Sequence, residues 1–148
     1  FMEKVLSFNS NFGWISITEN NGNIKSVSFN KSNNIGNSKK LIKLKKEIIN
    51  YFLNKNKTFN TNVELLGTKL QVQIWNELKK ISFGKTKSYG EIAKKFNTSP
   101  RYIGNVCSKN KHLLIIPCHR VIRSDGKLGG FSAKGGLKLK EKLLKLEK

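Results

Sequence analysis

The chain has 148 residues, of which 29 are Lys or Arg and 9 are Asp or Glu, giving a formal net charge of +20 at pH 7. This length suits one ordinary domain or two small ones, and a hydrophobic content of 37% argues against wholesale disorder. The charge favours a polyanionic partner such as nucleic acid. A composition rich in lysine and asparagine, as AT-rich genes encode, explains part of it equally well.

The chain has two cysteines, Cys107 and Cys118, and two histidines, His112 and His119. This set excludes a multi-bridge disulfide framework and leaves no separate structural zinc site. No segment reaches the length and apolar character of a membrane span, and the given residues include no charged-then-apolar leader. We therefore expect a soluble intracellular protein with no metal, no cofactor and no membrane contact.

The first third predicts a small sheet and one helix. Residues 14–18 and 24–29 alternate apolar and polar side chains, and Asn21-Gly22 between them favours a tight hairpin turn. After a polar stretch at 31–38, apolar residues recur at the three- and four-residue spacings of an amphipathic helix. They are Leu41, Leu44, Ile48, Tyr51 and Phe52.

A second linker at about 55–64 suggests a boundary between an N-terminal α/β scaffold domain, residues 1–64, and a C-terminal domain, residues 65–148. In the second part, apolar spacing predicts a helix over 68–81, which Phe83 to Thr86 ends.

Two short helices are predicted next, over 89–96 and from Pro100 onward. Ser99 can cap the second helix, and Pro100 suits its first turn. Such a pair is typical of a helix-turn-helix, although pattern alone leaves an ordinary helical hairpin equally open.

The residues with the clearest chemistry follow an apolar run at 113–116. Pro117 ends the run and delivers Cys118 beside His119. A cysteine attacks carbon as the thiolate, and a neighbouring imidazole or cation lowers its pKa from about 8.5. Arg120 adds positive charge, as does Arg123. By contrast, Cys107 fits a small buried hydrophobe on a helix face, and His112 is expected to be an ordinary surface or loop histidine.

These residues resemble a known family, the O6-alkylguanine-DNA alkyltransferases, also called methylated-DNA–protein-cysteine methyltransferases. The resemblance covers about residues 65–148, and its motifs occur in the family's order. They are Gly67 to Gln71 with Trp75, Gly84 to Thr86, Ser88-Tyr89, Pro100-Arg101, Gly104, Asn110, Pro117 to Val121, Gly129 to Ser132, and Leu143 to Glu147.

The resemblance implies an α+β chain. A small N-terminal sheet and helix, ribonuclease-H-like, would precede a mainly helical C-terminal domain with a helix-turn-helix. It implies a monomer that acts on double-stranded DNA containing O6-alkylguanine, and O4-alkylthymine as well. The alkyl group would pass once and irreversibly to Cys118, with the base flipped out through the minor groove.

The same resemblance implies roles for single residues. His119 would deprotonate Cys118 through a bound water, and Glu147 would orient His119. Tyr89 would crowd the target phosphate and donate a proton toward the leaving guanine, and Arg101 would fill the gap in the duplex. Asn110 would hold the turn before Cys118. The remaining implied site residues are Gly104, Ser108 and Arg120 at the DNA, and Val121, Phe131 and Ser132 in the base pocket.

The sequence departs from the family at two of these positions. Phe131 stands where relatives often carry tyrosine, and Ser108 where some carry arginine. Both changes bear on substrate range and rate and leave the nucleophile in place.

Two other readings fit parts of the pattern. A module that recognises alkylated bases without repairing them would use the same fold and charge and leave Cys118 unmodified. A cysteine hydrolase using Cys118, His119 and Glu147 would turn over an ester or peptide, and would need neither a basic chain nor the 89–110 region.

Overall fold

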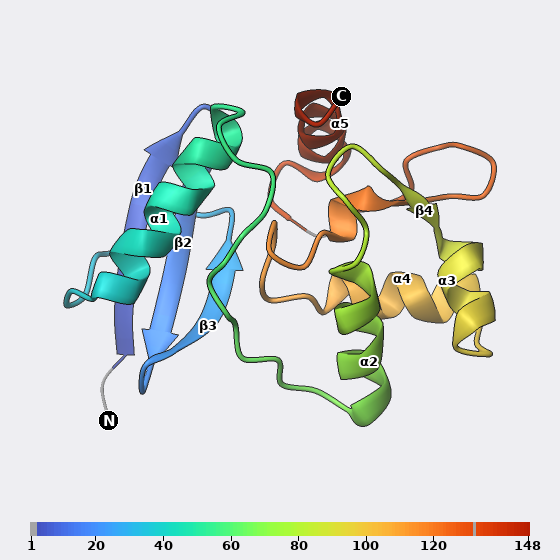
Figure 1. Cartoon of the computed structure of the whole chain (residues 1–148), viewed down its shortest axis with the longest axis horizontal. Helices are drawn as coiled ribbons and strands as arrows, with labels where there is room; N and C mark the ends of the chain where they lie inside the picture. Colours follow the sequence, from blue (N-terminus) through green and yellow to red (C-terminus); the bar gives the residue numbers. More distant parts are fainter. Residues whose placement is uncertain (1–2, 132) are drawn as a thin grey trace. The chain divides into compact units, whose positions relative to one another are not determined.

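The computed structural model describes residues 3–131 and 133–148 and divides the chain into two compact units (Figure 1). The first unit comprises residues 1–65 together with 111–113, and the second comprises 66–110 and 114–148. The chain therefore returns to the first unit for Lys111 to Leu113, which the expected division at residues 64 and 65 does not contain.

The first unit is built on an antiparallel sheet in the order β1-β2-β3. Its strands are β1 (Glu3–Ser10), β2 (Gly13–Asn20) and β3 (Asn23–Ser28). Asn21 and Gly22 turn between β2 and β3 with φ values of 52° and 81°, which is the positive-φ pair that a tight hairpin needs. The Asn-Gly prediction is confirmed here.

A bulge explains why Ile24 and Val27 are both buried although they lie three residues apart. Thr18 pairs with Ser26 while Glu19 pairs with Ile24, so Lys25 is an extra residue on β3. Such an insertion resets the alternation of faces. Strict alternation over 24–29 was therefore wrong in detail, although the strand itself is present.

The helix α1 (Lys39–Phe52) covers this sheet and contacts β1 and β2 (Figure 1). Ser38 caps its start by accepting hydrogen bonds from the amides of Lys40 and Leu41. All five residues of the predicted apolar stripe are buried, namely Leu41, Leu44, Ile48, Tyr51 and Phe52.

The second unit holds four α-helices among the residues that the structure describes. They are α2 (Lys69–Leu78), α3 (Tyr89–Lys95), α4 (Pro100–Ser108) and α5 (Gly136–Leu146). Thr68 and Ser88 each form a capping box, and Ser99 caps α4 with Pro100 in its first turn. The predicted helix over 68–81 is shorter, because Thr68 is its cap and the helix ends at Leu78.

A short parallel pair of strands brings α3 beside the segment that carries Cys118. The strand β4 (Lys87–Ser88) precedes α3, and β5 (Val121–Ile122) follows the 3-10 turn η1 (Cys118–Arg120). Lys87 pairs with Val121, and Ser88 pairs with Ile122. No local pattern predicted this pairing, or the strand β1.

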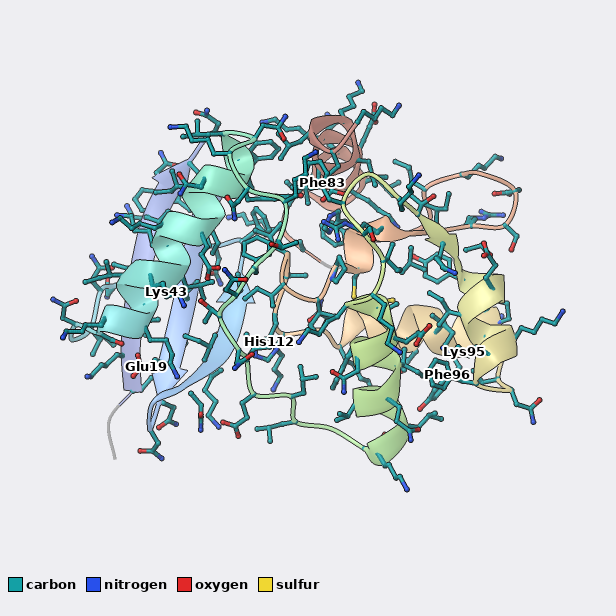
Figure 2. The ribbon with its side chains drawn as sticks, in the orientation of Figure 1. Glu19, Lys43, Phe83, Lys95, Phe96 and His112 are labelled. Atoms are coloured by element: carbon teal, nitrogen blue, oxygen red, sulfur yellow. The ribbon has the colours of Figure 1, made fainter. Side chains whose placement is uncertain are left out.

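His112 is buried, so its expected surface position was wrong. It is 4% exposed and lies beside β3, where it bridges Val27 and its Nε2 lies 3.3 Å from the carbonyl oxygen of Ile24 (Figure 2). Over residues 3–131 and 133–148, no helix has the length and apolar character needed to cross a bilayer.

Candidate active site

Cys118 begins η1 and is buried, with 4% of its surface exposed. The Asn110 side chain is hydrogen-bonded to the segment that carries Cys118. Its Nδ2 donates to the carbonyl oxygen of Ile116 at 2.9 Å and to the Cys118 Sγ at 3.2 Å. One amide group thus restrains both the backbone before the cysteine and the thiol itself. As expected from sequence, residues 113–116 are buried.

The surroundings of Cys118 do not lower the pKa of its thiol. Its hydrogen bond with the Cys107 thiol raises that pKa most, burial raises it further, and the Asn110 hydrogen bond and the Lys140 charge oppose the rise. The expectation that His119 and Arg120 depress the pKa was wrong, because both side chains bond to a carboxylate instead. At neutral pH the resting thiol is protonated, so a reaction at this sulfur requires a base.

His119 is fully buried, and its ring is oriented by Glu147. The distance between His119 Nε2 and Glu147 Oε2 is 2.8 Å. Burial lowers the pKa of His119 against the opposing effect of Glu147, and Arg120 adds to the lowering. A neutral ring that donates from Nε2 carries its free lone pair on Nδ1. Among the described residues Nδ1 has no hydrogen-bond partner, so this atom is available as a base.

Arg120 is bound inside the unit. Its Nε and Nη2 donate to the two carboxylate oxygens of Glu147 at 2.8 and 2.9 Å, and Nη1 donates to the carbonyl oxygen of Ile81 at 2.6 Å. Only 8% of its side chain is exposed. The implied contact of Arg120 with DNA is therefore not supported, because its guanidinium is bound to Glu147 and to the carbonyl oxygen of Ile81. Arg120 fixes the position of the Glu147 carboxylate instead.

Glu147 lies one residue past α5 and is 3% exposed, so its position near the chain end does not leave it in solvent. The amide of Gly84 lies 3.5 Å from Glu147 Oε1. Gly84 has a φ of +80°, and a Cβ there would lie 3.0 Å from the carbonyl oxygen of Glu147. A glycine is therefore required at this position of the Phe83 to Thr86 segment.

Beside Cys118 the second unit contains a cavity of about 600 Å³. Six residues expected at the site line it: Tyr89, Arg101, Gly104, Ser108, Cys118 and Phe131. The structure adds five others to its lining, namely Pro100, Cys107, Arg123, Gly129 and Gly130. A cavity of this volume accommodates a planar base with a substituent.

The expected pocket residue Val121 is not among the residues that line this cavity. Val121 is fully buried, and its carbonyl oxygen accepts a hydrogen bond from Lys140. Ser132 lies outside the residues that the structure describes.

Lys140 is a functional candidate that sequence reasoning missed. It is fully buried on α5, and its Nζ donates to Val121 O at 2.6 Å, to Gly130 O at 3.2 Å and to the Tyr89 hydroxyl at 3.3 Å. These three acceptors are uncharged, so the ammonium keeps a positive field at the cavity wall. Lysines are frequent along α5, and no local signal shows which of them is buried.

Tyr89 begins α3 and lies between Lys140 and the glycine loop. Its hydroxyl is 3.5 Å from Gly130 O. Gly129 has a φ of +73°, and a Cβ there would lie 2.9 Å from the Tyr89 ring, so glycine makes room for the phenol. Burial raises the pKa of Tyr89 to about 12. The group is therefore a neutral hydrogen-bond donor at physiological pH.

The burial of Lys140 predicts a pH-dependent stability. Burial lowers the pKa of Lys140 from 10.5 to about 8. As the pH rises from about 8, folded Lys140 loses its proton while the unfolded chain keeps it, so the free energy of unfolding rises until about pH 10.5. The difference in unfolding free energy between the wild type and Lys140→Met should therefore increase over this window in chemical denaturation.

The matched control is Lys138→Met, an exposed lysine on the same helix. It should show no such slope. A flat difference for Lys140→Met would mean that Lys140 titrates as an ordinary lysine.

The helical unit that carries this site matches a family model over residues 69–148. That model describes the DNA-binding domain of 6-O-methylguanine DNA methyltransferase. Residues 69–148 therefore belong to the class of DNA-binding domains that these methyltransferases contain.

Whole-chain comparisons lead to the same family. A methylated-DNA–protein-cysteine methyltransferase of Sulfolobus acidocaldarius is 41% identical over 142 residues, covering 95% of this chain and 90% of the relative. The crystal structure of Mycobacterium tuberculosis O6-methylguanine methyltransferase aligns with a TM-score of 0.86 and 27% identity, covering 99% of this chain and 93% of that one. The M. tuberculosis protein in complex with DNA gives 0.85 at 27% identity, covering 97% and 92%. The chain belongs to the methylated-DNA–protein-cysteine methyltransferase family, a family of transferases.

Proposed function

We propose that the chain repairs DNA by moving the alkyl group of O6-alkylguanine onto the Sγ of Cys118, once per molecule. The observation that carries this proposal is the joint placement of a buried thiol at the wall of a cavity and a neutral His119 held by Glu147. The names of the relatives add the substrate class. We extend the same chemistry to O4-alkylthymine, which presents its substituent in a comparable way.

The reaction is a displacement at the alkyl carbon. His119 Nδ1 takes the thiol proton through a water molecule, the sulfur attacks, and a carbon–sulfur bond replaces the carbon–oxygen bond of the guanine. The leaving guanine accepts a proton from the Tyr89 hydroxyl, and Lys140 beside that hydroxyl supports the charge that develops. The product thioether is not hydrolysed under mild conditions, so the protein is consumed.

Access to the lesion requires that the base leave the stack, which costs about a few kcal/mol. We assign this step to α3 and α4, acting as a helix-turn-helix in the minor groove. Arg101 is exposed at the start of α4 and also lines the cavity, so it can fill the vacated position next to the flipped base. Gly104 and Ser108 follow on the same helix.

Affinity for DNA would come mainly from phosphate contacts of the exposed lysines. It should therefore fall as salt rises. In this proposal the protein acts as a monomer, in the compartment of the cell that contains the DNA. The N-terminal unit, ribonuclease-H-like by family resemblance, serves as scaffold in this proposal.

The decisive measurement is the intact mass of the protein after mixing with a duplex that contains O6-methylguanine. The expected result is a gain of one methyl group, mapped to Cys118 and saturating at one per protein. An unchanged mass with tight lesion binding would instead support the passive reader, and repeated turnover of an ester would support the hydrolase.

Arg101 offers a test of base flipping. Arg101→Ala should slow methyl transfer from duplex DNA by about tenfold or more, because the lost interaction opposes an unstacking cost of about a few kcal/mol. Transfer from single-stranded DNA should change less, since no partner base is orphaned there. Single-turnover rates on both substrates measure this difference.

The control is Lys46→Ala, which removes one exposed charge from α1. An equal loss on duplex and single strand for Arg101→Ala would indicate a simple phosphate contact.

A further inference from the structure

Both cysteines of the chain lie at the same place in the second unit. Cys107 is near the end of α4 and Cys118 opens η1; both are free and buried. Their thiols form a hydrogen bond with each other, and the Cys118 Sγ lies 3.7 Å from the carbonyl oxygen of Cys107. Cys107 was expected to be only a buried hydrophobe, and its contact with the acceptor sulfur goes beyond that.

The pair is also reachable by a small solute. Cys107 and Cys118 both line the cavity of about 600 Å³. A molecule the size of hydrogen peroxide that enters this cavity can therefore contact both residues. A buried structural cysteine is inert because nothing reaches it. That protection does not apply to these two thiols.

Two hydrogen bonds at the Cys118 sulfur hold the thiols of Cys107 and Cys118 next to each other. Asn110 Nδ2 donates to the Cys118 Sγ, and the thiol of Cys107 bonds to the same sulfur. Because burial and the Cys107 contact raise the pKa of the Cys118 thiol, a base must take its proton before the sulfur reacts with a peroxide. One thiolate next to one thiol is the arrangement in which oxidation of the first sulfur leads to condensation with the second.

We propose that Cys107 and Cys118 form a reversible disulfide when the protein meets a peroxide, and that this bond protects the acceptor sulfur. His119 Nδ1 takes the thiol proton of Cys118 through a water molecule, and the sulfur attacks one peroxide oxygen to become a sulfenic acid. The leaving hydroxide takes up that proton and departs as water. The thiol of Cys107 then displaces a second water and closes the sulfur–sulfur bond. In total, two thiols lose two electrons and two protons, and one peroxide becomes two water molecules.

The consequence for repair rests on the proposed function. A disulfide sulfur cannot take an alkyl group, so the oxidised protein is inactive until a thiol reductant reopens the bond. Without Cys107, the sulfenic acid has no partner and proceeds to sulfinic acid, which ordinary reductants do not reverse. The disulfide would thus prevent irreversible oxidation of a protein that can carry out only one repair reaction.

The test uses the reduced 148-residue chain, oxidised in the absence of DNA. After treatment with hydrogen peroxide and capping of free thiols with N-ethylmaleimide, the expected intact mass shows the loss of two hydrogens and no capped thiol. Peptide mapping should give one linked pair that contains Cys107 and Cys118. Methyl transfer should be lost in proportion to this species and return with dithiothreitol.

Cys107→Ser and Cys107→Ala, each first checked for a cooperative thermal transition, provide the comparison. Under the same treatment Cys118 should gain two oxygens, and dithiothreitol should not restore transfer. Oxygen addition to Cys118 in the wild type with Cys107 still capped would overturn the proposal, as would a link between two molecules. Mapping of the link needs no lesion, so failure of methyl transfer by the reduced protein would count against the proposed function alone.

Discussion

Cys118→Ser is expected to take up no alkyl group from O6-methylguanine DNA while it still binds the lesion. The serine hydroxyl can accept the hydrogen bond that Asn110 Nδ2 gives to the sulfur, so the local structure has little reason to change. A hydroxyl is far less acidic and less nucleophilic than a thiol, and the neutral His119 is a weak base for it. Intact mass and gel-shift binding measure the two properties separately.

The matched variant is Cys107→Ser, which changes the other thiol by the same atom. It should still accept one methyl group per protein at Cys118, with a rate of its own because Cys107 lines the cavity. If Cys118→Ser instead gained a methyl group, the modified peptide would identify another acceptor, and the role assigned to Cys118 would be wrong.

The second large effect is expected for Glu147→Gln. This change removes the carboxylate that orients His119 and pairs with Arg120. Loss of an oriented general base should slow transfer by about 10²- to 10⁴-fold. Because the Arg120 charge would stay buried without its partner, the free energy of unfolding should fall by about 3–5 kcal/mol.

Single-turnover rates, taken below the melting transition of the variant, separate chemistry from unfolding. Glu141→Gln on the same helix is the control. Its carboxylate is 56% exposed and forms a surface ion pair with Lys145, so the change should alter the free energy of unfolding by less than about 1 kcal/mol. The double change Arg120→Gln and Glu147→Gln should recover stability and not rate. A normal rate in Glu147→Gln would remove His119 orientation from the mechanism.

Local chemistry made several elements predictable. Asn21-Gly22 specifies its turn through two residues that tolerate positive φ, and Ser99 with Pro100 specifies the start of α4. Periodic apolar residues predicted α1 because its buried stripe repeats within one helix. Cys118 was a candidate nucleophile from sequence for a similar reason, since proline, cysteine, histidine and arginine are adjacent in the chain.

Other features depend on residues far apart in sequence. Glu147 lies 28 residues from His119 and 27 from Arg120, and only family resemblance, not periodicity or spacing, pointed to its place at the site. The expected contact of Arg120 with DNA is not supported, because its guanidinium is bound to the buried carboxylate of Glu147. A sequence shows the charge but not this ion pair. The expected lowering of the Cys118 pKa failed for the same reason.

The sequence by itself therefore determined the Asn-Gly turn, the cap of α4, the amphipathic helix α1 and the choice of Cys118 as candidate nucleophile, each from residues that are near neighbours in the chain. The tertiary structure decided which of many lysines is buried beside Tyr89, which carboxylate binds His119, and that the Cys107 side chain contacts that of Cys118. These contacts depend on how helices and loops that are remote in the chain come together. Burial then sets the strength of the electrostatic interactions and the protonation state of each group.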